Sequence, residues 1–294
     1  MTATHTAFGG LWIPLVTPFR DGRVDHDALA ALARRLTPSG IAGFVVGGST
    51  AEAASLDEDE TWHCLATVAA HADGLPLILG LGGEHLGHAR AKVREAGRIA
   101  RDTCPTLRGL LVSAPQYIRP GQAGVRAWFE TLADDSALPL VVYDIPYRTG
   151  TTIDRDTLLA LAAHPRIAAI KDCGGDLGKT QAMLADGRLA VLAGEDLQLF
   201  SHLALGAPGA ISASAHLRTE RFVGLMTAMA SGQLPEARQL WRELVPLIET
   251  LFAEPNPGLL KAALAAGGAM LDELRPPMQS ASALVRQRLE PLLR

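Results

Sequence analysis

The segment Arg166-Ile-Ala-Ala-Ile-Lys171 is a short apolar run that ends on a lysine. A run of this length is too short for a helix and is typical of a strand buried on both faces of a parallel sheet. The other runs of this kind are Leu11–Val16, Ile41–Val46, Pro76–Leu81, Gly109–Val112, Leu138–Tyr143, Leu189–Ala193 and Gly209–Ile211. With Ile167–Ile170 they predict eight strands.

The spacing of the predicted strand ends indicates how the strands are arranged. The residues at or just after the ends are Thr17, Ser49, Leu81, Ser113, Tyr143, Lys171, Gly194 and Ser212, with steps of 32, 32, 32, 30, 28, 23 and 18 residues between them. Eight near-regular βα units predict an α/β fold of the (β/α)8 TIM-barrel type. An open doubly wound sheet is the alternative, but it usually carries a glycine-rich phosphate loop where this chain has Thr17-Pro18-Phe19.

Helical patterns with aspartate start signals lie between the strands. The predicted helices are Asp27–Leu36, Glu58–Ala72, Leu86–Asp102 and Arg155–Ala163. Beyond about His216 no strand pattern appears, and helices are expected at Glu220–Ala230, Pro235–Phe252, Pro257–Ala266 and Ser280–Leu293. We therefore expect a barrel catalytic domain at 1–215 and a helical C-terminal domain, packed on the barrel, at 216–294.

Composition excludes several classes of function. The net charge of −4 has no basic stripe, which argues against a nucleic-acid partner. No apolar run reaches the roughly 18 residues that a membrane span needs, and residues 1–10 lack the features of a signal peptide. Three cysteines without a CxxC pair argue against a disulfide scaffold or a zinc site. We expect a cytoplasmic protein.

Lys171 is the leading candidate for chemistry, because catalytic groups of such barrels lie at the C-terminal ends of the strands. Only four of the 27 basic residues are lysines, so a lysine in an apolar setting is informative here. Burial among apolar groups lowers the pKa of a lysine and frees neutral amine. Neutral amine attacks a ketone to form an iminium, which acts as an electron sink. The alternative is a lysine that pairs with Asp172.

Polar residues at the neighbouring strand ends complete the predicted site. Tyr143 ends the preceding strand and is expected to pass protons to and from a ketone oxygen, although a tyrosine at the barrel rim is the alternative. Ser49 and Thr50 are expected to extend the proton path or to bind a carboxylate, and Gly48 lets a ligand approach the backbone. Arg148 is suited to bidentate binding of a carboxylate, or is a surface arginine.

Three further features are weaker. Gly194 and Glu195 follow the seventh strand, where Glu195 is expected to contact substrate hydroxyls or a metal, or to cap the next helix. Tyr117 lies shortly after the fourth strand. His85 and His88 have the spacing of one helix face but no evident third ligand, so no metal site is predicted.

Taken together, several motifs resemble the dihydrodipicolinate synthase / N-acetylneuraminate lyase family of class I aldolases. They are Ile13-Pro-Leu-Val-Thr-Pro-Phe19, Gly47-Gly-Ser-Thr-Ala-Glu52, Tyr143-Asp-Ile-Pro-Tyr-Arg-Thr-Gly150, Ile170-Lys-Asp-x-x-Gly174 and Glu254-Pro-Asn-Pro257. The resemblance implies a (β/α)8 barrel with a C-terminal helical domain, a homotetramer built from tight dimers, pyruvate as substrate, and no metal or organic cofactor.

The resemblance also implies roles for individual residues. Lys171 matches the imine-forming lysine and Tyr143 the proton-relay tyrosine. Ser49-Thr50 matches the hydroxyl pair that binds the pyruvate carboxylate and relays protons, in the form found in neuraminate lyases. The remaining matches are Tyr117 with a relay tyrosine from the neighbouring subunit, Ile211 with a residue near the pyruvate, and Arg148 with the arginine that holds the carboxylate of aspartate semialdehyde.

Some positions depart from the synthase pattern. Ala51 replaces a glycine and Gln116 replaces a tyrosine. The positions that would form a lysine feedback site are Ala53, Ala54, Glu58 and Glu84, so feedback inhibition by lysine is not expected.

The leading hypothesis is condensation of pyruvate with aspartate semialdehyde. The second is a catabolic paralogue that acts as aldolase or dehydratase on a 2-oxo sugar acid or hydroxylated 2-oxo acid. The third is a barrel that binds a 2-oxo acid without turnover.

Overall fold

Eight parallel strands form a closed barrel, in the order β1-β10-β9-β8-β7-β6-β5-β4, in a computed structural model that describes residues 7–292. The strands are β1 (Gly10–Pro14), β4 (Gly43–Val46), β5 (Leu77–Leu81), β6 (Leu107–Ser113), β7 (Leu140–Asp144), β8 (Ile167–Asp172), β9 (Ala190–Ala193) and β10 (Gly209–Ile211). Each coincides with one predicted run. The predicted (β/α)8 fold class is confirmed.

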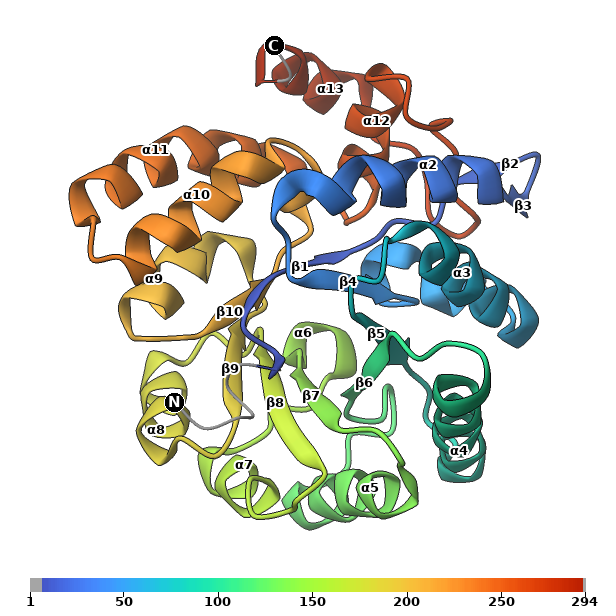
Figure 1. Cartoon of the computed structure of the whole chain (residues 1–294), viewed down its shortest axis with the longest axis vertical. Helices are drawn as coiled ribbons and strands as arrows, with labels where there is room; N and C mark the ends of the chain where they lie inside the picture. Colours follow the sequence, from blue (N-terminus) through green and yellow to red (C-terminus); the bar gives the residue numbers. More distant parts are fainter. Residues whose placement is uncertain (1–6, 293–294) are drawn as a thin grey trace. The chain divides into compact units, whose positions relative to one another are not determined.

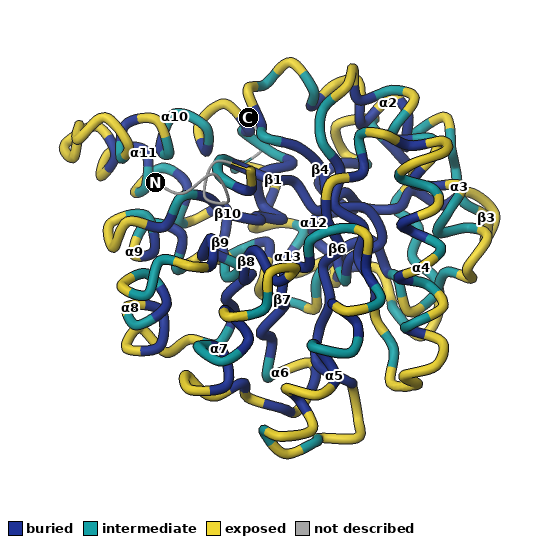
Figure 2. The backbone as a smooth tube through the Cα atoms, turned by 60° about the horizontal axis from the view of Figure 1, so that its bottom comes forward, coloured by how far each residue is buried: buried dark blue, intermediate teal, exposed yellow. Residues whose placement is uncertain are grey.

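The strands are buried as a parallel sheet requires. Every residue of β5, β7, β8 and β9 is buried, which explains why their sequences are continuous apolar runs rather than alternating ones. Figure 2 shows β7, β8 and β9 largely as buried tube, whereas much of the surrounding helices is exposed. β6 begins two residues before the predicted run, because Arg108 points outward and is exposed within an otherwise buried strand.

Helices alternate with the strands. They are α2 (His26–Leu36), α3 (Glu58–His71), α4 (Leu86–Asp102), α5 (Gln122–Asp135), α6 (Pro146–Thr149), α7 (Arg155–Leu161), α8 (Leu177–Asp186), α9 (Leu199–Ala204), α10 (Thr219–Ala230), α11 (Leu234–Leu251), α12 (Gly258–Ala266) and α13 (Ala283–Leu289). Asp57 and Glu60 form a capping box at the start of α3, and Asp25 caps α2.

The contacts of the described residues divide them into two compact units, residues 7–10 with 76–211 and residues 11–75 with 212–292. The first unit contains β5 to β10, and Figure 1 shows α5, α7 and α8 lying along the outside of its strands. In the second unit α2 contacts α3, and α10 contacts α11. The boundary between catalytic and C-terminal domains at residue 215 stays a prediction.

Two local features differ from the sequence analysis. The predicted helix Ser280–Leu293 is shorter, because α13 begins at Ala283 and ends at Leu289. A 3-10 turn (η6, Glu290–Leu292) follows at Pro291, which lacks the amide proton to continue a helix, and Leu293 lies outside the described residues. A hairpin of β2 (Phe19–Arg20) and β3 (Arg23–Val24) was not predicted. Its Asp21-Gly22 turn, with positive φ at both residues, is a recognisable sequence signal. Among residues 7–292, no helix has the length and apolar character needed to cross a membrane.

Candidate active site

Lys171 lies one residue before the end of β8, in the middle of three paired strands. The parallel register places it opposite Tyr143 on β7 and Leu192 on β9. Its side chain is only 5% exposed, because the apolar residues Ile167–Ile170 carry it into the buried sheet. The predicted adjacency of Lys171 and Tyr143 is therefore present in the structure.

The ammonium group of Lys171 contacts the phenol of Tyr143. Its Nζ donates to the Tyr143 hydroxyl at 3.4 Å and lies 4.4 Å from the centre of the ring. Within the described part of the chain, no carboxylate lies within ion-pair distance of this Nζ. The nitrogen and the phenol oxygen are thus close enough to exchange a proton.

Asp172 does not pair with Lys171, so the alternative interpretation of this lysine is wrong. The Asp172 carboxylate accepts hydrogen bonds from Thr180 Oγ1 at 2.5 Å and from the backbone N–H of Gly174 at 2.9 Å, and it lies 3.2 Å from His202 Nε2. Burial acts to raise the pKa of Asp172, but these hydrogen bonds outweigh it and hold the pKa below its ordinary value.

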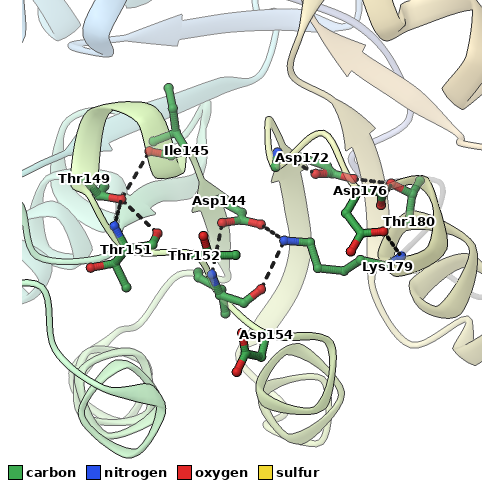
Figure 3. A network of polar contacts seen from close by, with 12 residues as sticks. Asp144, Ile145, Thr149, Thr151, Thr152, Asp154, Asp172, Asp176, Lys179 and Thr180 are labelled. Carbon is green, nitrogen blue, oxygen red and sulfur yellow. Dashed lines mark hydrogen bonds and ion pairs between the residues drawn. The ribbon is translucent and has the colours of Figure 1, made fainter.

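A second buried network fixes the end of β7 beside Tyr143 (Figure 3). Lys179 Nζ donates to the carboxylate of Asp144 and, at 3.0 Å, to the carbonyl oxygen of Ile153. Thr149 and Thr151 bond to each other within the following loop, where the N–H of Thr151 donates to Thr149 Oγ1 at 3.2 Å. These contacts determine the path of the segment that carries Arg148.

Arg148 itself lies on α6 and is exposed. Its guanidinium carbon is 5.8 Å from the centre of the Tyr147 ring, and within residues 7–292 it has no acidic partner at ion-pair distance. An exposed guanidinium that is not engaged by a carboxylate of the chain is available for an anionic ligand.

Gly194 packs directly against Lys171. A Cβ atom added to Gly194 would lie 2.8 Å from Lys171 Cγ and even closer to the sulfur of Cys173, so a side chain at this position would displace the lysine. Glu195 comes next and is half-buried, within hydrogen-bonding reach of Tyr147 and Cys173. Burial raises the pKa of the Glu195 carboxyl. Hydrogen bonds from the Tyr147 hydroxyl and the Cys173 thiol, together with the charge of Lys171, offset part of that rise.

Glu195 does not cap the turn that follows it. Glu195 precedes the 3-10 turn η4 (Asp196–Gln198), but its side chain makes no capping hydrogen bond there. His85 does cap a helix, because its Nδ1 accepts from the N–H of His88 at 3.2 Å at the start of α4. Within residues 7–292 no three potential ligands gather in a form that would hold a metal.

Two further predicted site residues, Tyr117 and Ile211, belong to the first unit. Tyr117 is 92% exposed, has a left-handed backbone (φ 67°) and makes no hydrogen bond with any of residues 7–292. Ile211 ends β10 and is 1% exposed, so it is part of the buried sheet. The shared-site role implied for Tyr117 stays a prediction.

The hydroxyl pair belongs to the second unit. Ser49 and Thr50 form the 3-10 turn η2 (Ser49–Ala51) directly after β4, and Thr50 is 4% exposed. Gly47 adopts a left-handed conformation (φ 68°) that favours glycine. A Cβ atom added to Gly48 would meet only Val45 among the described residues, at 3.8 Å, so the backbone of Gly48 is open to a ligand.

Two residues behind this loop were not predicted as parts of the site. The amide of Asn256 donates from Nδ2 to Thr50 Oγ1 at 3.0 Å, and the buried Lys261 donates to Glu52 Oε1 at 2.5 Å. The scarcity of lysines was a signal for Lys261, but nothing in the sequence pattern connects Asn256 with Thr50.

Comparisons with known proteins point to one family. The model of the dihydrodipicolinate synthetase family matches residues 7–294. The chain is 39% identical to 4-hydroxy-tetrahydrodipicolinate synthase 1 of Streptomyces coelicolor, over 93% of this chain and 89% of that protein. It is 33% identical to 4-hydroxy-tetrahydrodipicolinate synthase 2 of Clostridium acetobutylicum, over 97% and 99%.

Solved structures give the same result. Dihydrodipicolinate synthase from Aquifex aeolicus superposes with a TM-score of 0.92 at 29% identity, covering 97% of each chain. A monomeric dihydrodipicolinate synthase variant superposes with a TM-score of 0.93 at 28% identity, covering 98% of this chain and 97% of that one. From its sequence and its fold alike, this chain belongs to the dihydrodipicolinate synthetase family.

Proposed function

We propose that this protein is a lyase that forms a Schiff base between Lys171 and pyruvate and condenses it with aspartate semialdehyde, as a 4-hydroxy-tetrahydrodipicolinate synthase. The main support for the proposal is the contact of Lys171 Nζ with the Tyr143 hydroxyl. Within the described chain, Lys171 forms no ion pair with an acidic residue. Membership of the family, whose relatives bear the synthase name, supports the choice of substrates.

The proposed reaction begins with attack of neutral Lys171 on the keto carbon of pyruvate. Water leaves as the iminium forms, and loss of a methyl proton gives an enamine. The enamine carbon attacks the aldehyde carbon of aspartate semialdehyde, whose oxygen takes up a proton and becomes a hydroxyl. The amino group of the adduct then attacks the iminium carbon, which closes the ring and releases Lys171.

We assign the proton transfers to Tyr143, Ser49 and Tyr117. Thr50 and the backbone beside Gly48 bind the pyruvate carboxylate, while Ile211 and Gly194 shape the site. We assign Arg148 to the carboxylate of the aldehyde substrate, because a planar guanidinium binds a carboxylate through two parallel hydrogen bonds.

We also propose a cytoplasmic homo-oligomer, either a dimer or a dimer of dimers. The exposed Tyr117 supports an assembly in which a second copy uses this side chain. Three free, buried cysteines suit a reducing compartment.

The half-buried Glu195 favours one alternative, the cleavage or dehydration of a hydroxylated 2-oxo acid. A carboxyl group this close to Lys171 can accept a hydrogen bond from a substrate hydroxyl or exchange a proton with it. A sugar acid or hydroxylated 2-oxo acid supplies such a hydroxyl, whereas aspartate semialdehyde in its aldehyde form does not.

Turnover with a substrate panel tests the proposal. Pyruvate should be consumed with aspartate semialdehyde, and Arg148→Ala should raise the KM for the aldehyde by roughly tenfold or more while the KM for pyruvate changes little. Arg155→Ala removes another exposed arginine and is the matched control. Cleavage of sugar acids without any condensation would replace the proposal by the alternative. Absence of turnover with every substrate would favour a protein that binds a 2-oxo acid without converting it.

A further inference from the structure

The side-chain amide of Asn256 fixes the direction of a hydrogen bond at Thr50. Asn256 lies just before α12 and is 206 residues from Thr50 in the sequence, yet its Nδ2 donates to Thr50 Oγ1 at 3.0 Å. This is the one hydrogen bond of the Thr50 hydroxyl within residues 7–292, and the hydroxyl accepts it. A hydroxyl carries one proton and two lone pairs, so Thr50 retains its proton for a further partner.

Glu52 anchors the same loop to the C-terminal segment. Its Oε1 accepts from Lys261 Nζ at 2.5 Å, and its Oε2 accepts from the backbone N–H of Arg275 at 3.0 Å. Glu52 has a left-handed backbone (φ 56°), which is unfavourable for a residue with a side chain and persists only where surrounding contacts impose it. The buried pair therefore holds Thr50 at a defined place beside Asn256.

We propose that Asn256 is a positioning residue that orients the Thr50 hydroxyl as a hydrogen-bond donor to the carboxylate of the 2-oxo acid. The inference rests on the proposed function, in which Thr50 binds the pyruvate carboxylate. A carboxylate only accepts hydrogen bonds, so a hydroxyl that binds it must donate. Donation from Asn256 occupies an acceptor position of Thr50 and leaves its proton to face the ligand. The C-terminal segment thereby takes part in substrate recognition.

The isosteric substitution Asn256→Asp tests the direction of this bond. An aspartate at this position accepts and cannot donate, so the Thr50 proton turns towards residue 256 and away from the ligand. The KM for pyruvate should rise by about tenfold or more, and kcat should fall much less. Asn256→Ala leaves the hydroxyl free to turn either way and should raise the KM only about two- to fivefold. Thermal unfolding of both variants checks that the fold is retained.

Thr50→Val provides the control, because it removes the hydroxyl and keeps the volume. In that background Asn256→Asp should raise the KM for pyruvate much less than in the wild-type background, since the shared bond is gone and only the added charge remains. Equal KM values for the Asp and Ala variants, or an undiminished effect of Asn256→Asp in Thr50→Val, would overturn the inference.

Borohydride trapping separates this inference from the proposed function. At saturating pyruvate, wild type and every variant should form the Lys171 adduct, because none of these changes touches the lysine. Absence of an adduct in wild type would refute the proposed function. A wild-type adduct together with a wild-type KM in Asn256→Asp would refute the role of Asn256 alone.

Discussion

Three lysines of this chain are buried, and they differ in what their ammonium groups contact. Lys179 pairs with Asp144 and Lys261 pairs with Glu52, so both are neutralised by a carboxylate. Lys171 contacts the phenol of Tyr143 instead. A buried ammonium without a paired acid is costly to keep in a fold, and this cost supports the chemical role proposed for Lys171.

Tyr143→Phe tests the proton transfer at this contact. The substitution keeps the aromatic ring that lies 4.4 Å from Lys171 Nζ and removes only the hydroxyl. Steady-state turnover should fall roughly 100-fold or more, in the range of general acid–base contributions. Tyr147→Phe is the matched control and should cost clearly less. Wild-type turnover in Tyr143→Phe would exclude the phenol from the chemistry.

Only part of the candidate site was predictable from the sequence. Lys171 and Tyr143 were predictable because strand spacing places consecutive parallel strand ends side by side. Asn256 was not, because its contact with Thr50 joins segments 206 residues apart through a loop that has no periodic pattern. The environment of Asp172 was also out of reach, since its partners Thr180 and His202 come from helices whose packing the sequence does not specify.

At the scale of elements, the turn after β10 is tied to the turn after β1 by a buried histidine. The N–H of Val16 donates to His216 Nε2 at 3.2 Å, and Nδ1 faces the carbonyl oxygen of Ala213 at 2.8 Å. His216 therefore has the neutral form with its proton on Nδ1. Burial lowers the pKa of His216 to about 4. The imidazole is therefore protonated at a lower pH in the folded state than in the unfolded chain.

This histidine makes stability depend on pH. Between about pH 6.5 and pH 4 the unfolded chain binds a proton at His216 and the folded chain does not, so the free energy of unfolding falls as the pH falls. The full effect is about 3 kcal/mol. His216→Gln should lose less stability than wild type over this range in urea titrations. His88→Gln is the control for loss of an exposed histidine, and parallel curves for wild type and His216→Gln would contradict the prediction.

The boundaries of elements were less predictable than their existence. All eight predicted runs are strands, because burial on both faces leaves a clear apolar signature. The last helix was predicted too long, since Pro291 interrupts a pattern that otherwise continues. The Phe19–Val24 hairpin was missed although Asp21-Gly22 marks it, because its strands are only two residues long.

At the scale of the whole molecule, the exposed segment Tyr117–Ile118 is where we expect a second copy to bind. Tyr117 is 92% exposed and Ile118 is 57% exposed, an unusual placement for two large apolar side chains in succession. If the tyrosine serves the site of a neighbouring copy, a variant without it and a variant without the lysine should complement each other.

Subunit mixing tests this arrangement. Lys171→Ala and Tyr117→Ala should each be nearly inactive, and a mixture that has exchanged subunits should regain about a quarter of wild-type turnover. In a hybrid dimer one site combines an intact lysine with an intact tyrosine from the partner, and half of randomly mixed dimers are hybrids. Sedimentation measurements should show an oligomer. No recovery in a mixture that has demonstrably exchanged would mean that Tyr117 does not complete a neighbour's site.

The imine at Lys171 is the central claim, and trapping with borohydride measures it most directly. Pyruvate and borohydride should add the mass of one reduced pyruvate to each chain, and peptide mapping should locate it on Lys171. Lys171→Arg keeps the positive charge and should show no adduct. An unchanged wild-type mass, or an adduct that persists in Lys171→Arg on another of the four lysines, would contradict the account.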